Sequence, residues 1–166
     1  MSVRMEIVTY FQLERAWTWG LAVLGLLGLV LAGYLWLARG AWRGAALPIG
    51  IFAIIEIAVG VSVALRSPAQ AAELVRRADA GEDLGPERVR IDGVARTFAI
   101  LKIAELMLFA AGVVVIYGLR GSSFAVAVGL GVIVQCSALF AFDLIASRRA
   151  EVYRDALYAM PASKAR

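Results

Sequence analysis

The sequence predicts an all-α integral membrane protein, a four-helix bundle whose helices alternate in direction across the bilayer (up-down-up-down). Two observations predict this class: 61% of the 166 residues are hydrophobic, and the apolar residues gather into four long blocks. A soluble domain has roughly 45–50% apolar residues, so this chain carries more apolar surface than a soluble core can bury. A β-barrel would instead show ~10-residue segments of alternating hydrophobicity, which the sequence lacks.

The four apolar blocks have the length of membrane-spanning helices. They cover residues 17–37, 47–65, 98–119 and 124–145, with bounds that are approximate. Each block is close to the ~20 residues that a helix needs to cross ~30 Å of hydrocarbon. The first block exceeds the ~7–15 apolar residues of a signal-peptide core, so we expect it to remain in the protein as a membrane helix.

The basic residues predict the orientation of these spans. Thirteen of the 17 Lys and Arg residues lie before the first span, between the second and third, or after the fourth. Because Lys and Arg accumulate on the cytoplasmic side of a membrane, we expect both termini and the segment 67–96 to lie in the cytoplasm. The lipid bilayer, through its anionic lipids, is the expected partner of the net charge of +4. No basic patch interleaved with aromatic residues points to nucleic acid.

Helical structure is also predicted on the cytoplasmic side. The Ser-Pro-Ala-Gln motif at residues 67–70 combines an N-cap, a first-turn proline and a capping-box glutamine. It predicts a separate short helix that ends near Ala80. After the fourth span, residues 146–160 contain good helix formers and no glycine, so we expect that helix to extend into the cytoplasm. Its apolar residues recur at helical spacing and are expected to pack on the short helix or on the segment Tyr10–Leu13.

The two halves of the chain resemble each other when one is shifted by 79 residues. Gly50 then falls on Gly129, Glu56 on Gln135, and Ala71 on Ala150. A duplicated helical hairpin would place the halves around an axis along the membrane normal. The identities are few, and the sequence leaves open whether the hairpin was duplicated.

Five polar residues lie inside the predicted spans: Glu56, Lys102, Glu105, Gln135 and Asp143. A charge near the membrane centre costs about 2.5–3.5 kcal/mol on insertion scales and usually faces the bundle interior. Counting ~1.5 Å per residue from the nearest cytoplasmic arginine places Lys102 and Asp143 in one layer. The same count places Glu56 and Glu105 in a deeper layer. We therefore expect Lys102 to pair with Asp143, and Glu56 to face Glu105.

This buried polar track has two interpretations. In the first, it is a site for a proton, an ion or a small polar ligand, with a glutamic acid as the exchangeable group. In the second, a Lys102–Asp143 ion pair and hydrogen bonds among Glu56, Glu105 and Gln135 hold the helices together, as polar side chains do in other membrane bundles. The sequence leaves both interpretations open.

The sequence offers no recognisable enzyme chemistry. It contains no histidine and a single cysteine, Cys136, so neither a Ser–His nor a Cys–His pair can form. It has no phosphate-binding glycine loop after a strand, and Asp143 is the only aspartate in a span. We expect a non-enzymatic protein without cofactor or metal, since a metal would have to bind carboxylates alone.

Three motifs in the second half resemble a pattern in small, uncharacterised bacterial membrane proteins with four transmembrane helices. The motifs are Phe98-x-x-x-Lys102-x-x-Glu105, Gly129-x-Gly131-x-x-x-Gln135 and Asp143-x-x-Ala146-x-Arg148-Arg149-x-x-x-Tyr153. The resemblance implies the same fold and a location in the bacterial inner membrane. It implies no mechanism, because that group has no established function.

These features favour a non-enzymatic inner-membrane protein that binds an ion, a proton or a small ligand, or that is an accessory subunit of a membrane complex. The alternative is an immunity-type membrane protein that binds and neutralises a toxin. Gly121, Ala125 and Gly129 recur at four-residue spacing and favour close helix packing. That packing could occur within one chain, in a homo-oligomer or in a larger membrane complex.

Overall fold

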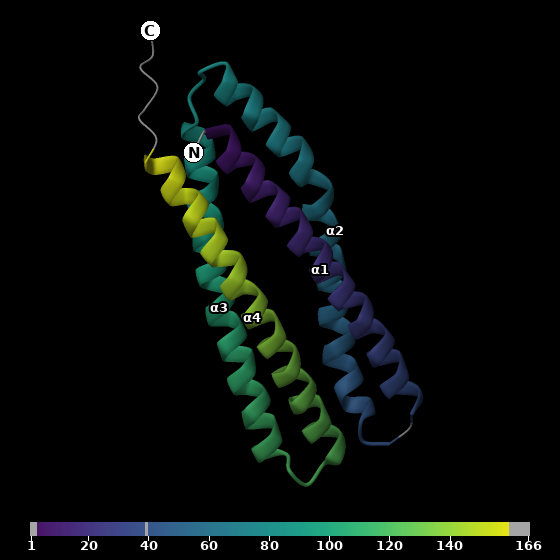
Figure 1. Ribbon diagram of the computed structural model, residues 1–166. Coiled ribbons are helices and arrows are strands. Elements are labelled where there is room, and N and C mark those ends of the chain that lie inside the picture. Colours follow the sequence, from purple (N-terminus) through teal and green to yellow (C-terminus); the bar gives the residue numbers. More distant parts are fainter. Residues whose placement is uncertain (1–2, 39, 160–166) are drawn as a thin grey trace.

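The computed structural model describes residues 3–38 and 40–159, and this part of the chain forms four α-helices and no strand (Figure 1). The helices are α1 (Val3–Leu37), α2 (Arg43–Asp79), α3 (Gly85–Gly118) and α4 (Ser123–Ala159). Each helix is long and apolar enough to cross a membrane. The predicted all-α fold with four candidate membrane-spanning helices is therefore confirmed.

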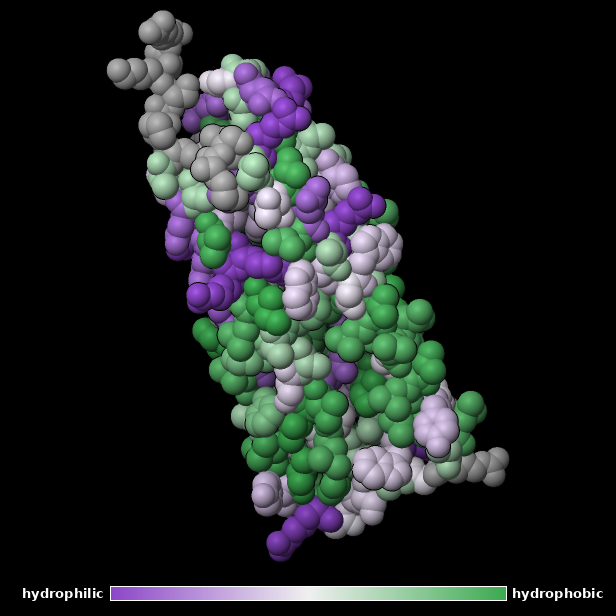
Figure 2. Space-filling model, viewed as in Figure 1, coloured by the Kyte–Doolittle hydropathy of each residue, from purple (hydrophilic) through white to green (hydrophobic). Residues whose placement is uncertain are grey.

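The helices are longer than a bilayer requires. They contain 34 to 37 residues each, whereas a span needs ~20. Figure 1 shows the start of α1, the end of α4 and the α2–α3 connection at one end of the molecule, with the other two connections at the opposite end. Figure 2 shows hydrophilic side chains gathered at the first of these ends, next to a broad apolar band. The bundle thus has an apolar body and a charged end.

The structure corrects the predicted separate short helix, because residues 67–79 are a continuation of α2. Ser67 does not cap a new helix: its Oγ lies 2.6 Å from Glu14 Oε2 on α1 and also bonds to the preceding turn of α2. Pro68 removes one backbone donor. The segment remains helical because Leu74 is buried in an apolar cluster that all four helices form.

Glycines allow close contact between the helices of each hairpin. A Cβ atom added at Gly25 of α1 would lie 2.6 Å from the carbonyl oxygen of Ala53 on α2. One added at Gly129 of α4 would lie 2.7 Å from the carbonyl oxygen of Gly112 on α3. Small residues permit such backbone approach in membrane bundles. Gly129 therefore packs within the chain, whereas Gly121 of the same predicted stripe faces open space.

α4 is the central helix of the bundle. It packs on α3 and also contacts α2 and α1, while α1 packs on α2. Among the described residues, no Cα atom of α3 lies within 8 Å of a Cα atom of α1 or α2. α2 and α4 have 37 residues each and begin and end 80 positions apart, close to the shift that a duplicated hairpin requires. In a fully symmetric duplication, a contact between α3 and α2 would correspond to the contact between α1 and α4. α1 and α4 do touch, whereas α3 stays apart from α2, so the two halves depart from full symmetry.

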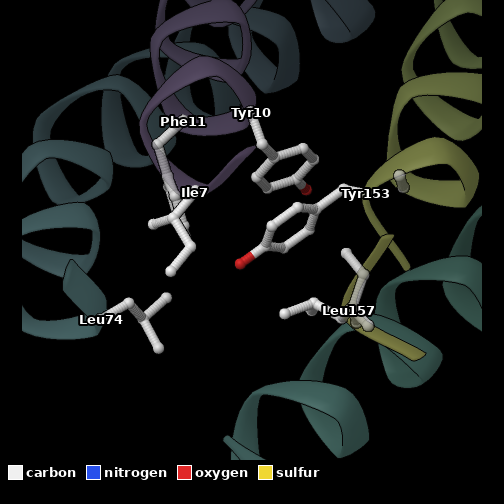
Figure 3. Packing of buried hydrophobic residues seen from close by; sticks show 8 residues of the cluster. Ile7, Tyr10, Phe11, Leu74, Tyr153 and Leu157 are labelled. Carbon is white, nitrogen blue, oxygen red and sulfur yellow. The ribbon is translucent and has the colours of Figure 1, made fainter. Parts of the chain in front are cut away.

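Buried side chains from all four helices form an end cluster at the charged end of the bundle (Figure 3). Its members are Ile7, Tyr10, Phe11, Leu74, Ile91, Ala150, Tyr153 and Leu157. The rings of Tyr10 and Tyr153 stack with centroids 4.1 Å apart. The predicted continuation of α4 and its packing on the segment Tyr10–Leu13 are thus confirmed as far as Ala159. Residue 160 lies outside the described part of the chain.

The two stacked tyrosines act as hydrogen-bond donors in the end cluster. Burial, reinforced by the charge of Glu14, raises the pKa of Tyr10 to about 12. Burial, reinforced by Glu87, also raises the pKa of Tyr153. The Tyr153 hydroxyl donates to Glu87 Oε1 over 3.1 Å. Because both hydroxyls stay protonated at neutral pH, Tyr153 ties α4 to α3 through a polar bond as well as through packing.

Candidate functional site

The five predicted polar residues lie on three helices and form two groups. Glu56 is on α2, Lys102 and Glu105 are on α3, and Gln135 and Asp143 are on α4. Glu56, Glu105 and Gln135 are buried, whereas Lys102 and Asp143 are half-buried. Their inward placement is the one expected of polar groups in a membrane bundle. The two groups sit at different helix contacts, one between α2 and α4 and the other between α3 and α4.

The first group is a hydrogen-bonded pair between α2 and α4. Gln135 Nε2 donates to Glu56 Oε1, and only 1% of Glu56 is exposed. The hydrogen bond expected between Glu56 and Gln135 is therefore present, and the expected pairing of Glu56 with Glu105 across the bundle is not the one that the structure shows. The pairing with Glu105 fails because α4 is the neighbour of α2, and α3 is not. Glu56 Oε2 has no hydrogen-bond partner.

The second group is a pair of carboxyl groups between α3 and α4. The carboxyls of Glu105 and Asp143 interact with each other, and Lys102 interacts electrostatically with both. Glu105 Oε2 is buried without a hydrogen-bond partner. Two carboxyl groups can form a hydrogen bond only when one carries a proton, since an ionised carboxyl has acceptors alone. A hydrogen bond within this pair would therefore need one bound proton.

The structure also corrects the predicted ion pair between Lys102 and Asp143. Lys102 Nζ donates instead to Ser147 Oγ over 3.3 Å. Ser147 lies one helical turn beyond Asp143, and the long lysine side chain reaches past Asp143 toward the charged end. Ser147 lies four residues after Asp143 on the same helix face, and this spacing could have identified Ser147 as a partner of Lys102 from the sequence.

A cavity of about 540 Å³ lies between the two hairpins, and all four helices line it. It occupies the region where α3 stays apart from α1 and α2. Five acidic or basic side chains line this inter-hairpin cavity: Glu14, Arg66, Arg90, Asp143 and Arg149. Asp143 thus belongs both to the carboxyl pair and to the cavity wall.

The charged residues of the inter-hairpin cavity differ in their partners. Arg90 forms a two-pronged ion pair with Glu87, with both nitrogen–oxygen distances 2.7 Å. Arg149 Nη1 donates to the Leu13 carbonyl oxygen over 2.9 Å. Glu14 accepts hydrogen bonds from hydroxyl groups of Tyr10 and Ser67.

Burial lowers the pKa of the Arg149 guanidinium, while Tyr10 and Glu14 act in the opposite direction. The sequence prediction missed Glu14, Arg66, Arg90 and Arg149 because it considered polar residues inside the spans alone. The sequence could have indicated these four residues, because they flank the predicted spans on the same side of the membrane.

No grouping of three or more His, Cys, Asp or Glu residues that could hold a metal ion occurs within residues 3–38 and 40–159. The chain matches no protein-family model, no curated protein and no solved structure. The chemistry of the carboxyl pair and of the cavity is therefore the basis for a functional interpretation.

Proposed function

We propose that the protein is a non-enzymatic, multi-pass membrane protein that binds a proton at the Glu105–Asp143 carboxyl pair. Its helices alternate across the bilayer, and the charged end with both termini lies in the cytoplasm. The distribution of Lys and Arg supports this orientation. The resemblance of the motifs around Lys102, Gln135 and Asp143 to bacterial membrane proteins supports a location in the inner membrane.

The observation that carries this proposal is the interaction of Glu105 with a second carboxyl group, that of Asp143, which lines the inter-hairpin cavity. An unpaired buried polar group costs about 1–3 kcal/mol, and both Glu105 Oε2 and Glu56 Oε2 are such groups. The two sites differ in their neighbours: Glu56 is bonded to the neutral amide of Gln135, whereas Glu105 interacts with a second carboxyl group. The second carboxyl group is what favours proton binding at Glu105, because two neighbouring negative charges repel each other.

Lys102 supports the same proposal. Its ammonium group is held at Ser147, near enough to act electrostatically on both carboxyls without forming an ion pair. It can therefore offset the single negative charge of a pair that holds one proton. Ionised residues in membrane spans commonly mark proton pathways.

The test is a count of protons released by the purified protein in bilayer nanodiscs after a jump from neutral to alkaline pH. With a pH-indicator dye, the wild-type chain is expected to release about one proton more than Glu105→Gln, since the pair holds one shared proton. The control Glu82→Gln, which replaces an exposed glutamate outside the pair, should release as many protons as the wild type. Equal release by the wild type and Glu105→Gln would contradict the proposal.

A further inference from the structure

Apolar side chains line one part of the inter-hairpin cavity, and charged side chains line another part. Val59, Val63, Phe98, Leu101 and Phe142 form part of its apolar wall, and all five lie within the predicted spans. Arg66, Arg149 and Glu14 line it next to the ends of those spans. We infer that this cavity binds an anionic phospholipid, with the phosphate diester at the arginines and the upper acyl chain along the apolar wall.

The size and position of the cavity fit such an occupant. Its volume of about 540 Å³ falls within the ~300–1,000 Å³ of typical ligand pockets. The charged lining residues lie next to the ends of the predicted spans, and Figure 2 shows a hydrophilic end of the bundle next to an apolar band. Phospholipid headgroups occupy the same boundary in a bilayer.

The net charge of the cavity selects an anionic headgroup. Arg90 is neutralised by Glu87, so it adds no free positive charge. Among the residues that the structure describes, Arg66 forms no ion pair, and the hydrogen bonds of Arg149 go to uncharged backbone carbonyls. Asp143 also lines the cavity, and Lys102 offsets the single negative charge that the Asp143–Glu105 pair carries when it holds one proton. Glu14 offsets one of the two arginines, so one positive charge remains to be balanced. A phosphate diester carries one negative charge and accepts hydrogen bonds from guanidinium groups.

The helix arrangement gives a lipid access to the cavity. Because α3 stays more than 8 Å from α1 and α2 by Cα distance, an acyl chain can enter between the hairpins from the side. Gly93 of α3 lines this space, and a Cβ atom added there would meet nothing within 4 Å. Anionic lipids concentrate in the cytoplasmic leaflet near basic groups. The charge count rests on the proposed function, because the carboxyl pair is taken to carry one negative charge, whereas the apolar wall and the arginines do not depend on it.

The experiment is native mass spectrometry of the protein in detergent with added phosphatidylglycerol, phosphatidylcholine or glycerol 3-phosphate. One phosphatidylglycerol is expected to remain bound per chain, at lower concentration than phosphatidylcholine. Arg66→Gln should weaken phosphatidylglycerol binding about fivefold, as expected for loss of about 1 kcal/mol from one arginine at a membrane surface. Arg66 is exposed and has no ion pair with any residue that the structure describes, so this substitution should leave the fold intact.

Gly93→Phe should abolish lipid binding by filling the cavity. The matched control is Gly33→Phe, because Gly33 of α1 is likewise exposed and has nothing within 4 Å of an added Cβ, yet does not line the cavity. It should bind the lipid as the wild type does, and so should Glu105→Gln, which removes the proposed proton site alone. Equal retention of both phospholipids, retention by Gly93→Phe, or equal binding of glycerol 3-phosphate would overturn the inference.

Discussion

Replacing Tyr153 with alanine is expected to lower the free energy of unfolding by about 3–5 kcal/mol, the usual effect of removing a buried aromatic ring. Tyr153 is 2% exposed and stacks on Tyr10 in the end cluster. Its loss leaves a cavity where α1 and α4 meet, and it removes a hydrogen bond from the buried carboxylate of Glu87. The measurement is reversible unfolding of the purified protein in mixed detergent micelles.

Two controls separate packing from the loss of the hydroxyl group. Tyr153→Phe keeps the ring and should lower the free energy of unfolding by only about 0.5–1.5 kcal/mol. Tyr158→Ala removes a tyrosine on the same helix that is 53% exposed, and its effect should be smaller than that of Tyr153→Ala. If Tyr153→Ala and Tyr158→Ala are equally stable, the end cluster does not hold the bundle together.

Replacing Gln135 with leucine is expected to lower the free energy of unfolding by about 1–3 kcal/mol, because it leaves the carboxyl of Glu56 buried without a donor. Glu56→Leu should have a similar effect, since it strands the Gln135 amide at the contact of α2 and α4. In the double variant both polar groups are gone and leucine packs against leucine. Its stability should be closer to the wild type than the sum of the single effects implies.

The Gln135–Glu56 cycle is measured by the same unfolding assay in detergent. Positive coupling identifies this pair as a structural bond between the hairpins. Simple addition of the two single effects would show that the hydrogen bond does not contribute to stability. A matched pair of leucine substitutions at Glu105 and Asp143 then shows whether the carboxyl pair behaves differently from this amide–carboxyl pair.

Much of the fold followed from the sequence because it depends on hydrophobicity and length. The four apolar blocks predicted the four helices, and the apolar spacing of residues 152–157 predicted the packing of α4 on the start of α1. The boundary at Ser67 was wrong because a capping motif is local. Such a motif carries no information about tertiary packing. Leu74, seven residues later, is buried against the other helices and keeps α2 continuous.

The candidate site followed from the sequence only in part. All five predicted polar residues lie inside the bundle or at its cavity. The expected hydrogen bond between Glu56 and Gln135 is present, whereas the predicted ion pair between Lys102 and Asp143 is replaced by a hydrogen bond to Ser147. Counting residues along a helix gives the depth of Glu56 and Glu105, whereas their contacts depend on which helices are neighbours. The inter-hairpin cavity arises from the separation of α3 from α2, a feature of helix tilt and packing that no single segment encodes.

We expect Glu105 and Asp143 to share one proton at neutral pH, and infrared spectroscopy of the protein in bilayer nanodiscs measures this sharing most directly. The wild-type spectrum should contain the carbonyl stretch of a protonated carboxyl that shifts on exchange into deuterated water. That component should disappear in Glu105→Gln and remain in Glu56→Gln. A wild-type spectrum that loses no protonated-carboxyl component in Glu105→Gln would contradict the claim.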